Sequence, residues 1–308
     1  MESQLPRRKL VLAWDMHYQC NYCCPYCFYT KAGWGGLAQK NVYKTPAEWE
    51  TIWRRIHALY GRCQLRITAG EPFTYPRFVE VLAAITPWHD VQVTTNGSLT
   101  KAIKAFVRKV DPKQVELDCT FHPLNTAIEP FLDNVLLLRR HKFTANVCYL
   151  AYPPQLPEMA GFKKKFAARG VHMNLAIYWG KHQDKDYPFA YTAEEKKLIK
   201  EVSGTEIGPE MVNLDPILVK DKICGAGQRY AVVQADGQVY RCGQLCYDGQ
   251  AIASIFDPNF KLLPDGKPCP VDYCRCKEFQ SAWEDEEKNF LLQENRLRPV
   301  ETKPAPAG

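Results

Sequence analysis

The stretch LVLAWDMHYQCNYCCPYC, residues 10–27, runs from a short apolar segment directly into a loop with four cysteines. The apolar segment has the length and composition of a β-strand. Cys20, Cys24 and Cys27 follow it with the spacing C-x3-C-x2-C, and Tyr26 precedes the last of them. A strand that leads into a loop of reactive side chains is typical of folds in which parallel strands alternate with helices, because their sites lie at the carboxyl ends of the strands.

The same alternation of strand and helix continues over the first part of the chain. Five further strand candidates, separated by longer helical stretches, are residues 64–68, 91–95, 114–120, 143–150 and 171–178. The first helix has a clear start, because Thr45 can cap it, Pro46 suits its first turn and Glu48 completes a capping box. Six strands that are each followed by a helix predict parallel strands joined by right-handed crossovers. The expected fold class is α/β, with a partial, open (β/α)6 barrel.

Polar residues share one face of the second to sixth strands, since side chains alternate across a strand. The set is Gln64, Arg66 and Thr68; Gln92, Thr94 and Asn96; Glu116, Asp118 and Thr120; Thr144, Asn146 and Cys148; and His172, Asn174 and Tyr178. Helices should cover the apolar faces, so this set is predicted to line the lumen, where Glu116, Asp118, Tyr178 and the nearby His122 are candidates for substrate contact. A hydrogen-bonded network without a ligand is the alternative.

The C-terminal part of the chain is rich in cysteine and differs from the barrel region. Six cysteines lie between residues 211 and 280, and Asp236-Gly237 is a strong signal for a tight hairpin turn. We expect three parts: a barrel domain over 10–205, a small cysteine-rich domain with a β-hairpin over 211–280, and a helix with a loose tail over 281–308.

Charge and cysteine content narrow the possible classes of function. A net charge of +6 is mild and no basic helix is evident, so a nucleic-acid partner is not expected. The sequence has no apolar run of the roughly 20 residues that a membrane helix needs and no signal-peptide core. We therefore expect a cytoplasmic protein without a membrane partner.

Thirteen cysteines, an odd number concentrated in two groups, favour metal binding over disulfides. In the first group, iron–sulfur is favoured over zinc, which usually takes a second nearby pair.

Together with three later motifs, the first cysteine group resembles that of the radical SAM enzymes. Members of this family hold a [4Fe–4S] cluster with C-x3-C-x2-C, and the one open iron binds S-adenosylmethionine. Their G-G-E-P motif is similar to residues 69–72, with Ala69 in place of the first glycine, and their T-N-G motif is similar to residues 95–97. Thr120 lies where many members carry the serine of Ser-x-Asp, although His122 replaces the aspartate.

The resemblance implies a role for each matching residue. Cys20, Cys24 and Cys27 would ligate the cluster, whereas Cys23 falls outside the pattern. The residues that would bind S-adenosylmethionine are Tyr26, Ala69, Gly70, Glu71, Asn96 and Thr120. Among these, Glu71 would receive the methionine ammonium group and Thr120 the ribose.

The second cysteine group has a family pattern of its own. Cys224 and Cys242 flank Gly237 with the spacing C-x12-G-x4-C, which resembles the start of the SPASM and twitch domains that carry auxiliary [4Fe–4S] clusters. The rest of the SPASM signature is incomplete, so one auxiliary cluster is expected. Its remaining ligands are predicted to be Cys274 and Cys276, with Cys269 as the next candidate. A zinc ribbon is the alternative.

These patterns lead to one functional hypothesis. The chain would be a radical SAM enzyme that cleaves S-adenosylmethionine reductively to a 5′-deoxyadenosyl radical and abstracts hydrogen from a small polar, sugar-like molecule or a peptide. Its electron donor would be a flavodoxin or ferredoxin. Only about ten residues precede the first strand, so no leader-peptide domain is expected there, which favours a small substrate.

One further thiol is a candidate for the reaction itself. Cys148, on the inner face of the fifth strand, could donate a hydrogen atom to a substrate radical, or it could be an inert buried thiol. There are two alternative functions. The chain could be an RNA-modifying radical SAM enzyme, or a non-catalytic protein that binds iron–sulfur or zinc or senses redox state.

Overall fold

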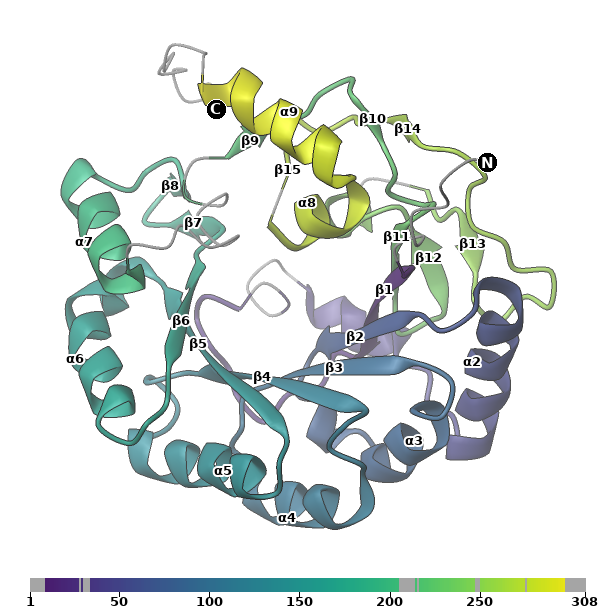
Figure 1. Ribbon diagram of the computed structural model, residues 1–308, viewed down its shortest axis with the longest axis horizontal. Coiled ribbons are helices and arrows are strands. Elements are labelled where there is room, and N and C mark those ends of the chain that lie inside the picture. The colour runs from purple at the N-terminus through teal and green to yellow at the C-terminus, as the bar shows by residue number, and fades with distance from the viewer. Residues whose placement is uncertain are drawn as a thin grey trace, which may run out of the picture.

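One curved sheet dominates the computed structural model, which describes residues 9–27, 29, 34–204, 214, 216–246, 250–274 and 276–296. Of residues 34–36, 276, 277, 295 and 296 it describes the backbone alone. Helices cover the outer side of the arc that the sheet forms, and the C-terminal elements lie across its open side (Figure 1). Residues 206–210, between the first two expected domains, and the part of the expected tail beyond residue 296 lie outside the described residues.

The six expected strands are present and parallel. They are β1 (Val11–His17), β2 (Gln64–Ala69), β3 (Asp90–Thr95), β4 (Val115–Phe121), β5 (Thr144–Ala151) and β6 (Met173–Ile177). The helices that follow them in turn are α2 (Pro46–Tyr60), α3 (Phe78–Ile85), α4 (Thr100–Lys109), α5 (Ile128–Arg140), α6 (Leu156–Ala167) and α7 (Ala193–Ser203). Each strand pairs in parallel with the next, from β1 to β6. The predicted α/β fold with a partial, six-stranded barrel is confirmed.

The first β–α unit shows why the sequence folds in this way. Thr45 caps α2 and Glu48 bonds back to it, so the predicted capping box is confirmed. Trp49 and Trp53 of α2 are buried against Trp14 of β1, with ring centroids 4.6 and 4.9 Å from that of Trp14. Since side chains alternate along β1, its opposite face is left for the interior of the barrel.

The sheet continues beyond β1 into the C-terminal part of the chain. β11 (Tyr230–Val233) runs parallel to β1, and β12 (Gln238–Tyr240) and β13 (Ala253–Ser254) extend the sheet to nine strands in the order β13-β12-β11-β1-β2-β3-β4-β5-β6. The turn between β11 and β12 is the expected one, with Gly237 at φ +80°. A Cβ atom there would lie 2.4 Å from the ring of Phe256, so this position requires glycine.

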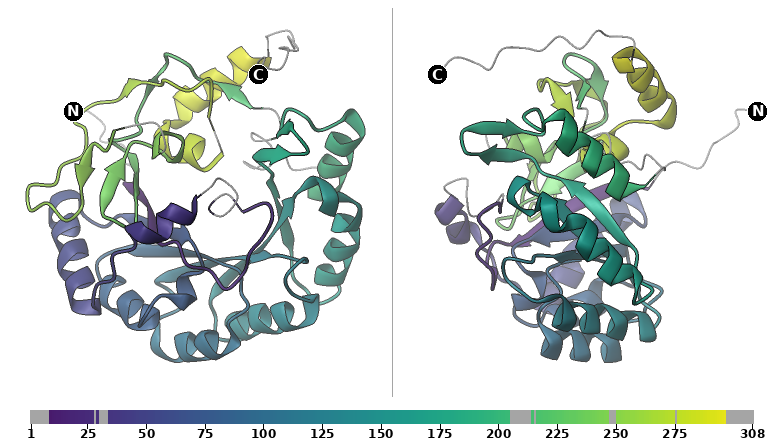
Figure 2. Two further views of the ribbon diagram at one scale, coloured as in Figure 1. Left: turned by 180° about the vertical axis from the view of Figure 1, so that it is seen from behind. Right: turned by 90° about the vertical axis from the view of Figure 1, so that its left-hand side faces the viewer.

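Smaller elements complete the fold. The short strands are β7 (Gly180–His182), β8 (Lys185–Tyr187), β9 (Ile217–Leu218), β10 (Ile223–Cys224), β14 (Lys267–Pro268) and β15 (Tyr273–Cys274). The 3-10 helices are η1 (Trp34–Lys40), η2 (Pro72–Thr74), η3 (Pro153–Gln155) and η5 (Gly243–Cys246), and the last two α-helices are α8 (Cys276–Ala282) and α9 (Asp285–Arg296). Seen from behind, the chain after β1 passes in front of the central strands (Figure 2). Within the ranges described above, every helix is too short or too polar to cross a membrane.

Candidate active site

A cavity of about 740 Å³ occupies the inside of the barrel. Most of the polar strand positions that were predicted to face inward line it, namely Arg66, Thr68, Gln92, Thr94, Asn96, Asp118, Thr120, Asn146, Cys148, Asn174 and Tyr178. Gln64, Glu116, Thr144 and His172 are absent from this lining. These four lie at or near the amino-terminal ends of their strands, whereas the cavity borders the carboxyl ends.

Three of the four cysteines after β1 face this cavity. Cys20, Cys24 and Cys27 line it, whereas Cys23 is exposed and does not. The backbone N–H of Cys27 donates to the carbonyl of Cys24 at 3.0 Å, which closes a tight turn between these two positions. Burial raises the pKa of the Cys24 thiol to about 11, so ligation of a metal would have to displace its proton.

Amide groups from distant loops contact the cysteine sulfurs. The side-chain amide of Asn125, in the loop after β4, donates to Sγ of Cys24 at 3.1 Å, and that of Asn96 lies 3.9 Å from Sγ of Cys20. Such contacts orient metal ligands and tune them. No sequence pattern points to Asn125, because it lies about 100 positions from Cys24 and belongs to no recognisable spacing motif.

Glu71, which follows β2, is a buried carboxylate with three donors. Its Oε1 accepts from the hydroxyl of Thr95 at 2.8 Å and from the N–H of Phe73 at 3.1 Å, and its Oε2 accepts from the N–H of Asn96 at 2.7 Å. Burial raises the pKa of Glu71 to about 7, although these hydrogen bonds oppose the shift. A cation beside this carboxylate would favour its charged form.

The loop after β2 packs directly on the loop after β1. The N–H groups of Gly70 and Glu71 donate to the carbonyls of His17 and Gln19 at 2.9 and 2.8 Å. A Cβ atom on Gly70 would lie 1.9 Å from the carbonyl oxygen of Gln19, so this contact permits only glycine. Ala69 has φ +91°, a conformation that glycine adopts without strain and alanine does not.

An aromatic pair borders the cysteine loop. Tyr26, directly before Cys27, shares a hydrogen bond of 2.9 Å between its hydroxyl and Nδ1 of His122, and the two rings stack with centroids 5.8 Å apart. Burial lowers the pKa of His122 to about 4, so this imidazole is neutral at pH 7. His122, which replaces the aspartate of Ser-x-Asp, therefore holds Tyr26 in place.

The wall opposite β1 carries the remaining candidates. Thr120 of β4 is directly opposite Cys148 of β5, and both line the cavity. Cys119, one position before Thr120, points to the other side of the sheet and is fully buried. One layer below, Asp118 accepts a hydrogen bond of 3.2 Å from the side-chain amide of Asn146.

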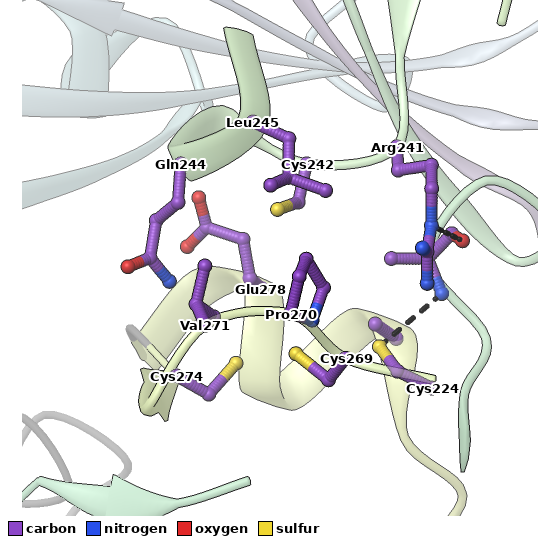
Figure 3. A pocket seen from close by; sticks show the side chains of 12 residues that line it. Cys224, Arg241, Cys242, Gln244, Leu245, Cys269, Pro270, Val271, Cys274 and Glu278 are labelled. Carbon is purple, nitrogen blue, oxygen red and sulfur yellow. Dashed lines mark hydrogen bonds between the residues drawn. The ribbon is translucent and has the colours of Figure 1, made fainter. Parts of the chain in front are cut away.

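Four cysteines of the second group meet in a separate pocket. Cys224, Cys242, Cys269 and Cys274 are all buried, line this pocket, and point into it (Figure 3). The interaction between the two neighbouring thiols lowers the pKa of Cys269 and raises that of Cys224. Of the remaining two, Cys246 is buried but is not part of the lining, and the side chain of Cys276 lies outside the described residues.

Helix α8 separates the two sites and contributes to both. Glu278 lines the four-cysteine pocket, whereas Gln280 lines the barrel cavity. The hydroxyl of Ser281 accepts a hydrogen bond of 2.9 Å from Nη1 of Arg66, a cavity residue of β2. The two sites are therefore separated by the thickness of one helix.

A second buried carboxyl group, which the sequence analysis did not single out, lies on the inner face of β1. Asp15 is 4% exposed, and its two oxygens accept from the hydroxyls of Tyr18 at 3.3 Å and Tyr29 at 3.1 Å. Burial raises the pKa of Asp15 to about 7. An acidic residue at an inward position of an otherwise apolar strand is the signal that could have identified it.

Known proteins resemble this chain in sequence over part of its length. A probable GTP 3′,8-cyclase of Methanocella arvoryzae is 33% identical over 114 residues, which are 36% of this chain and 35% of the relative. An S-adenosylmethionine-dependent nucleotide dehydratase of a Fibrobacter species is 26% identical over 129 residues, 39% of this chain and 37% of the relative. The chain thus matches little more than a third of the length of either relative. No family model matches it.

Solved structures resemble it over most of its length. SuiB of Streptococcus suis superposes with a TM-score of 0.61 and 15% identity over 82% of this chain and 64% of SuiB. The protein anSMEcpe, solved with bound AdoMet and a peptide, gives a TM-score of 0.57 at 15% identity over 80% of this chain and 78% of its own. At this identity the similarity concerns the fold.

The order of the motifs, the fold and the sequence relatives all point to the same class of protein. A C-x3-C-x2-C loop follows the first strand, G-E-P the second and T-N-G the third, within a sheet of parallel strands. In the order of its motifs and in its fold, the chain resembles the radical SAM enzymes.

The contact between the first two loops generates a matched pair of predictions. Gly70→Ala should lower the free energy of unfolding by about 2 kcal/mol or more, because the added Cβ overlaps the Gln19 carbonyl. It should also reduce the iron bound after anaerobic reconstitution, because the cysteine loop is displaced. Ala69→Gly should raise the free energy of unfolding by about 0.5–1 kcal/mol through relief of the positive φ. Urea unfolding and iron analysis measure these effects; equal behaviour of the two variants would contradict this account of the contact.

The raised pKa of Asp15 predicts how stability depends on pH. The folded protein retains a proton on Asp15 up to about pH 7, whereas the unfolded chain loses it near pH 4. The contribution of Asp15 to the free energy of unfolding should therefore fall by a few kcal/mol as the pH rises from about 4 to 7, and level off above 7.

Asp15→Asn should remove this decline of the Asp15 contribution, so that the stability of the variant relative to the wild type rises with pH when urea unfolding is followed from pH 5 to 8 without added iron. Asp133→Asn, on the exposed side of α5, is the matched control and should leave the decline unchanged. An equal pH dependence in the wild type and in Asp15→Asn would show that Asp15 is ionised in the folded protein.

Proposed function

We propose that the barrel cavity binds a [4Fe–4S] cluster and S-adenosylmethionine and performs radical chemistry on a substrate in the lumen. When bound, the reduced cluster would supply an electron to S-adenosylmethionine, whose cleavage would give methionine and a 5′-deoxyadenosyl radical that takes a hydrogen atom from the substrate. A flavodoxin or ferredoxin would provide the electron. The observation that carries the proposal is that one cavity is lined by Cys20, Cys24 and Cys27, while Cys23 faces away from it.

The residues of this site suit the proposed cofactors. Three thiols satisfy three irons of a cubane and leave one open, and cysteine thiolates are the usual ligands of such clusters. Glu71 offers a carboxylate to the methionine ammonium, and its three donors hold it in one orientation. Thr120 and Asn96 border the same cavity, where they can bond the rest of the cofactor. Tyr26 closes one side of it, held by His122.

The substrate would be a small polar molecule or a peptide. Most side chains that line the barrel cavity are polar, with amides, hydroxyls and the charged groups of Arg66 and Asp118, beside the apolar Leu150, Leu175 and Ile177. Closed barrels are filled mainly by branched apolar side chains. Cys148 borders the cavity beside Thr120, so its thiol is placed to donate a hydrogen atom to a radical formed on the substrate. Both relatives act on nucleotides according to their names, and a nucleotide is the competing substrate class.

The second site is proposed to hold one auxiliary iron–sulfur cluster. Its ligands would be Cys224, Cys242, Cys269 and Cys274, the four thiols that share a pocket. Cys269 is therefore proposed as the fourth ligand, although Cys276 was the first candidate from the sequence.

Cluster loading and cofactor cleavage test the proposal together. Cys24→Ala should abolish formation of 5′-deoxyadenosine from S-adenosylmethionine under dithionite, because one cluster ligand is lost. Cys23→Ala is the matched control, one position away but facing solvent, and should retain cleavage. Activity in Cys24→Ala and none in Cys23→Ala would refute the ligand assignment, and four bound irons without any cleavage would favour a redox-sensing protein.

Iron content tests the auxiliary site separately. The wild type should bind about eight irons per chain, and Cys274→Ser should bind about four, with loss of the second cluster. Cys246→Ser replaces a buried cysteine outside the pocket and should keep about eight. An equal loss in both variants, or zinc in place of iron, would contradict the four-cysteine assignment.

A further inference from the structure

We propose that Asn125, in the loop after β4, is a positioning residue that raises the reduction potential of the cluster in the barrel through a hydrogen bond to one of its cysteine ligands. This inference rests on the proposed function, since it concerns the cluster that Cys20, Cys24 and Cys27 would hold. It assigns a role in electron transfer to a residue that lies outside the cysteine motif, about 100 positions further along the chain.

The side-chain amide of Asn125 is directed at a cysteine sulfur. Its Nδ2 donates to Sγ of Cys24 at 3.1 Å. A thiolate that ligates iron accepts hydrogen bonds and donates none, so the NH2 end of the amide is the end that suits this sulfur. The contact can therefore remain when Cys24 loses its proton and becomes a ligand, and the negative charge of the thiolate would strengthen it.

A second amide near the cysteine loop is less well placed for this role. Nδ2 of Asn96 lies 3.9 Å from Sγ of Cys20, and the same nitrogen donates to the side-chain carbonyl of Asn21 at 2.9 Å. Hydrogen bonds weaken with distance, so the contact to Cys20 is the weaker of the two contacts to sulfur. Of these two amides, Asn125 is therefore the one that we expect to act on a cluster ligand.

The loop that carries Asn125 is itself fixed against the cysteine loop. The backbone N–H groups of Asn125 and Thr126 donate to the carbonyl of His122 at 2.9 and 3.2 Å, which closes a turn. The imidazole of His122 shares a hydrogen bond of 2.9 Å with the hydroxyl of Tyr26, directly before Cys27. The turn thus contacts the cysteine loop at two points, and the bond from the amide to sulfur is supported by the bond between the two rings.

A donor to a ligating sulfur affects the potential because reduction adds negative charge to the cluster. Hydrogen bonds to the sulfurs are among the factors that set the potentials of iron–sulfur clusters. The reduced cluster carries the greater negative charge, so a donor stabilises it more than the oxidised cluster. Asn125 is half-buried, so water screens this interaction only in part.

The hydrogen bond from Asn125 should therefore ease reduction of the cluster. In this step one electron passes from the flavodoxin or ferredoxin to the cluster. The donor protein is oxidised, the cluster is reduced, and no bond is formed or broken.

The test is a redox titration of the anaerobically reconstituted protein, followed by electron paramagnetic resonance. Only the barrel cluster is expected to have an open iron, so its signal is the one that changes when S-adenosylmethionine is added. Asn125→Leu removes the donor at similar side-chain size. At a fixed potential it should lower the ratio of reduced to oxidised barrel cluster by about threefold to tenfold, a factor of ten being about 59 mV for one electron. Asn125→Asp places a negative charge beside the sulfur and should lower the ratio further.

A neighbouring variant separates this effect from damage to the loop. Leu124→Ala changes the adjacent side chain, which is 55% exposed, and should titrate as the wild type does. The iron content of each variant is measured in the same samples and should equal that of the wild type. Asn125→Ala gives the same test with a smaller side chain, should Asn125→Leu bind less iron.

Three results would overturn the inference: the Asn125 variants titrate at the wild-type potential, their potential rises, or Leu124→Ala shifts the potential equally. Failure of the proposed function has a different signature. In that case no signal of the wild type would respond to S-adenosylmethionine, whatever the potentials of the variants.

Discussion

The close backbone contact between the loops after β1 and β2 is the constraint on which the site depends. Gly70 lies against the carbonyl of Gln19. Two hydrogen bonds join the loops there, from the N–H of Gly70 to the carbonyl of His17 and from the N–H of Glu71 to that of Gln19. Glu71, one position further on, is held in turn by Thr95 and Asn96 after β3. The ends of three adjacent strands are thereby locked together, and the cysteine loop is held against the Glu71 carboxylate.

Much of this arrangement could be predicted because local sequence patterns determine it. Strand alternation fixed which residues face the lumen, and capping signals fixed where α2 begins. The limit of the alternation argument is equally clear at Glu116 and His172, which have the right parity but lie too near the amino-terminal ends of their strands to reach the cavity. The alternation of side chains shows on which face of the sheet a residue lies. Whether that residue reaches the cavity also depends on its position along the strand and on where the neighbouring loops cover the sheet.

The contacts that escaped prediction are those between parts far apart in the chain. Asn125 reaches Cys24 from the loop after β4, and Ser281 of α8 bonds Arg66 across more than 200 positions. Spacing rules describe residues on one element and say nothing of which elements meet. For the second cysteine group the spacing therefore left the choice among Cys269, Cys274 and Cys276 open, while the fold brings Cys224, Cys242, Cys269 and Cys274 to one pocket.

The pairing of β11 with β1 has a consequence for how the chain reaches its native state. β1 is the strand that leads into the cysteine loop, and one of its two edges is completed only by residues that follow about 220 positions later. Until that late segment arrives, the edge presents unpaired backbone groups of the kind that promote aggregation. Joining segments so distant in sequence gives the fold a high contact order, and topologies of this type fold slowly. Shielding of the β1 edge during synthesis is thus a requirement that this architecture places on the cell that makes the protein.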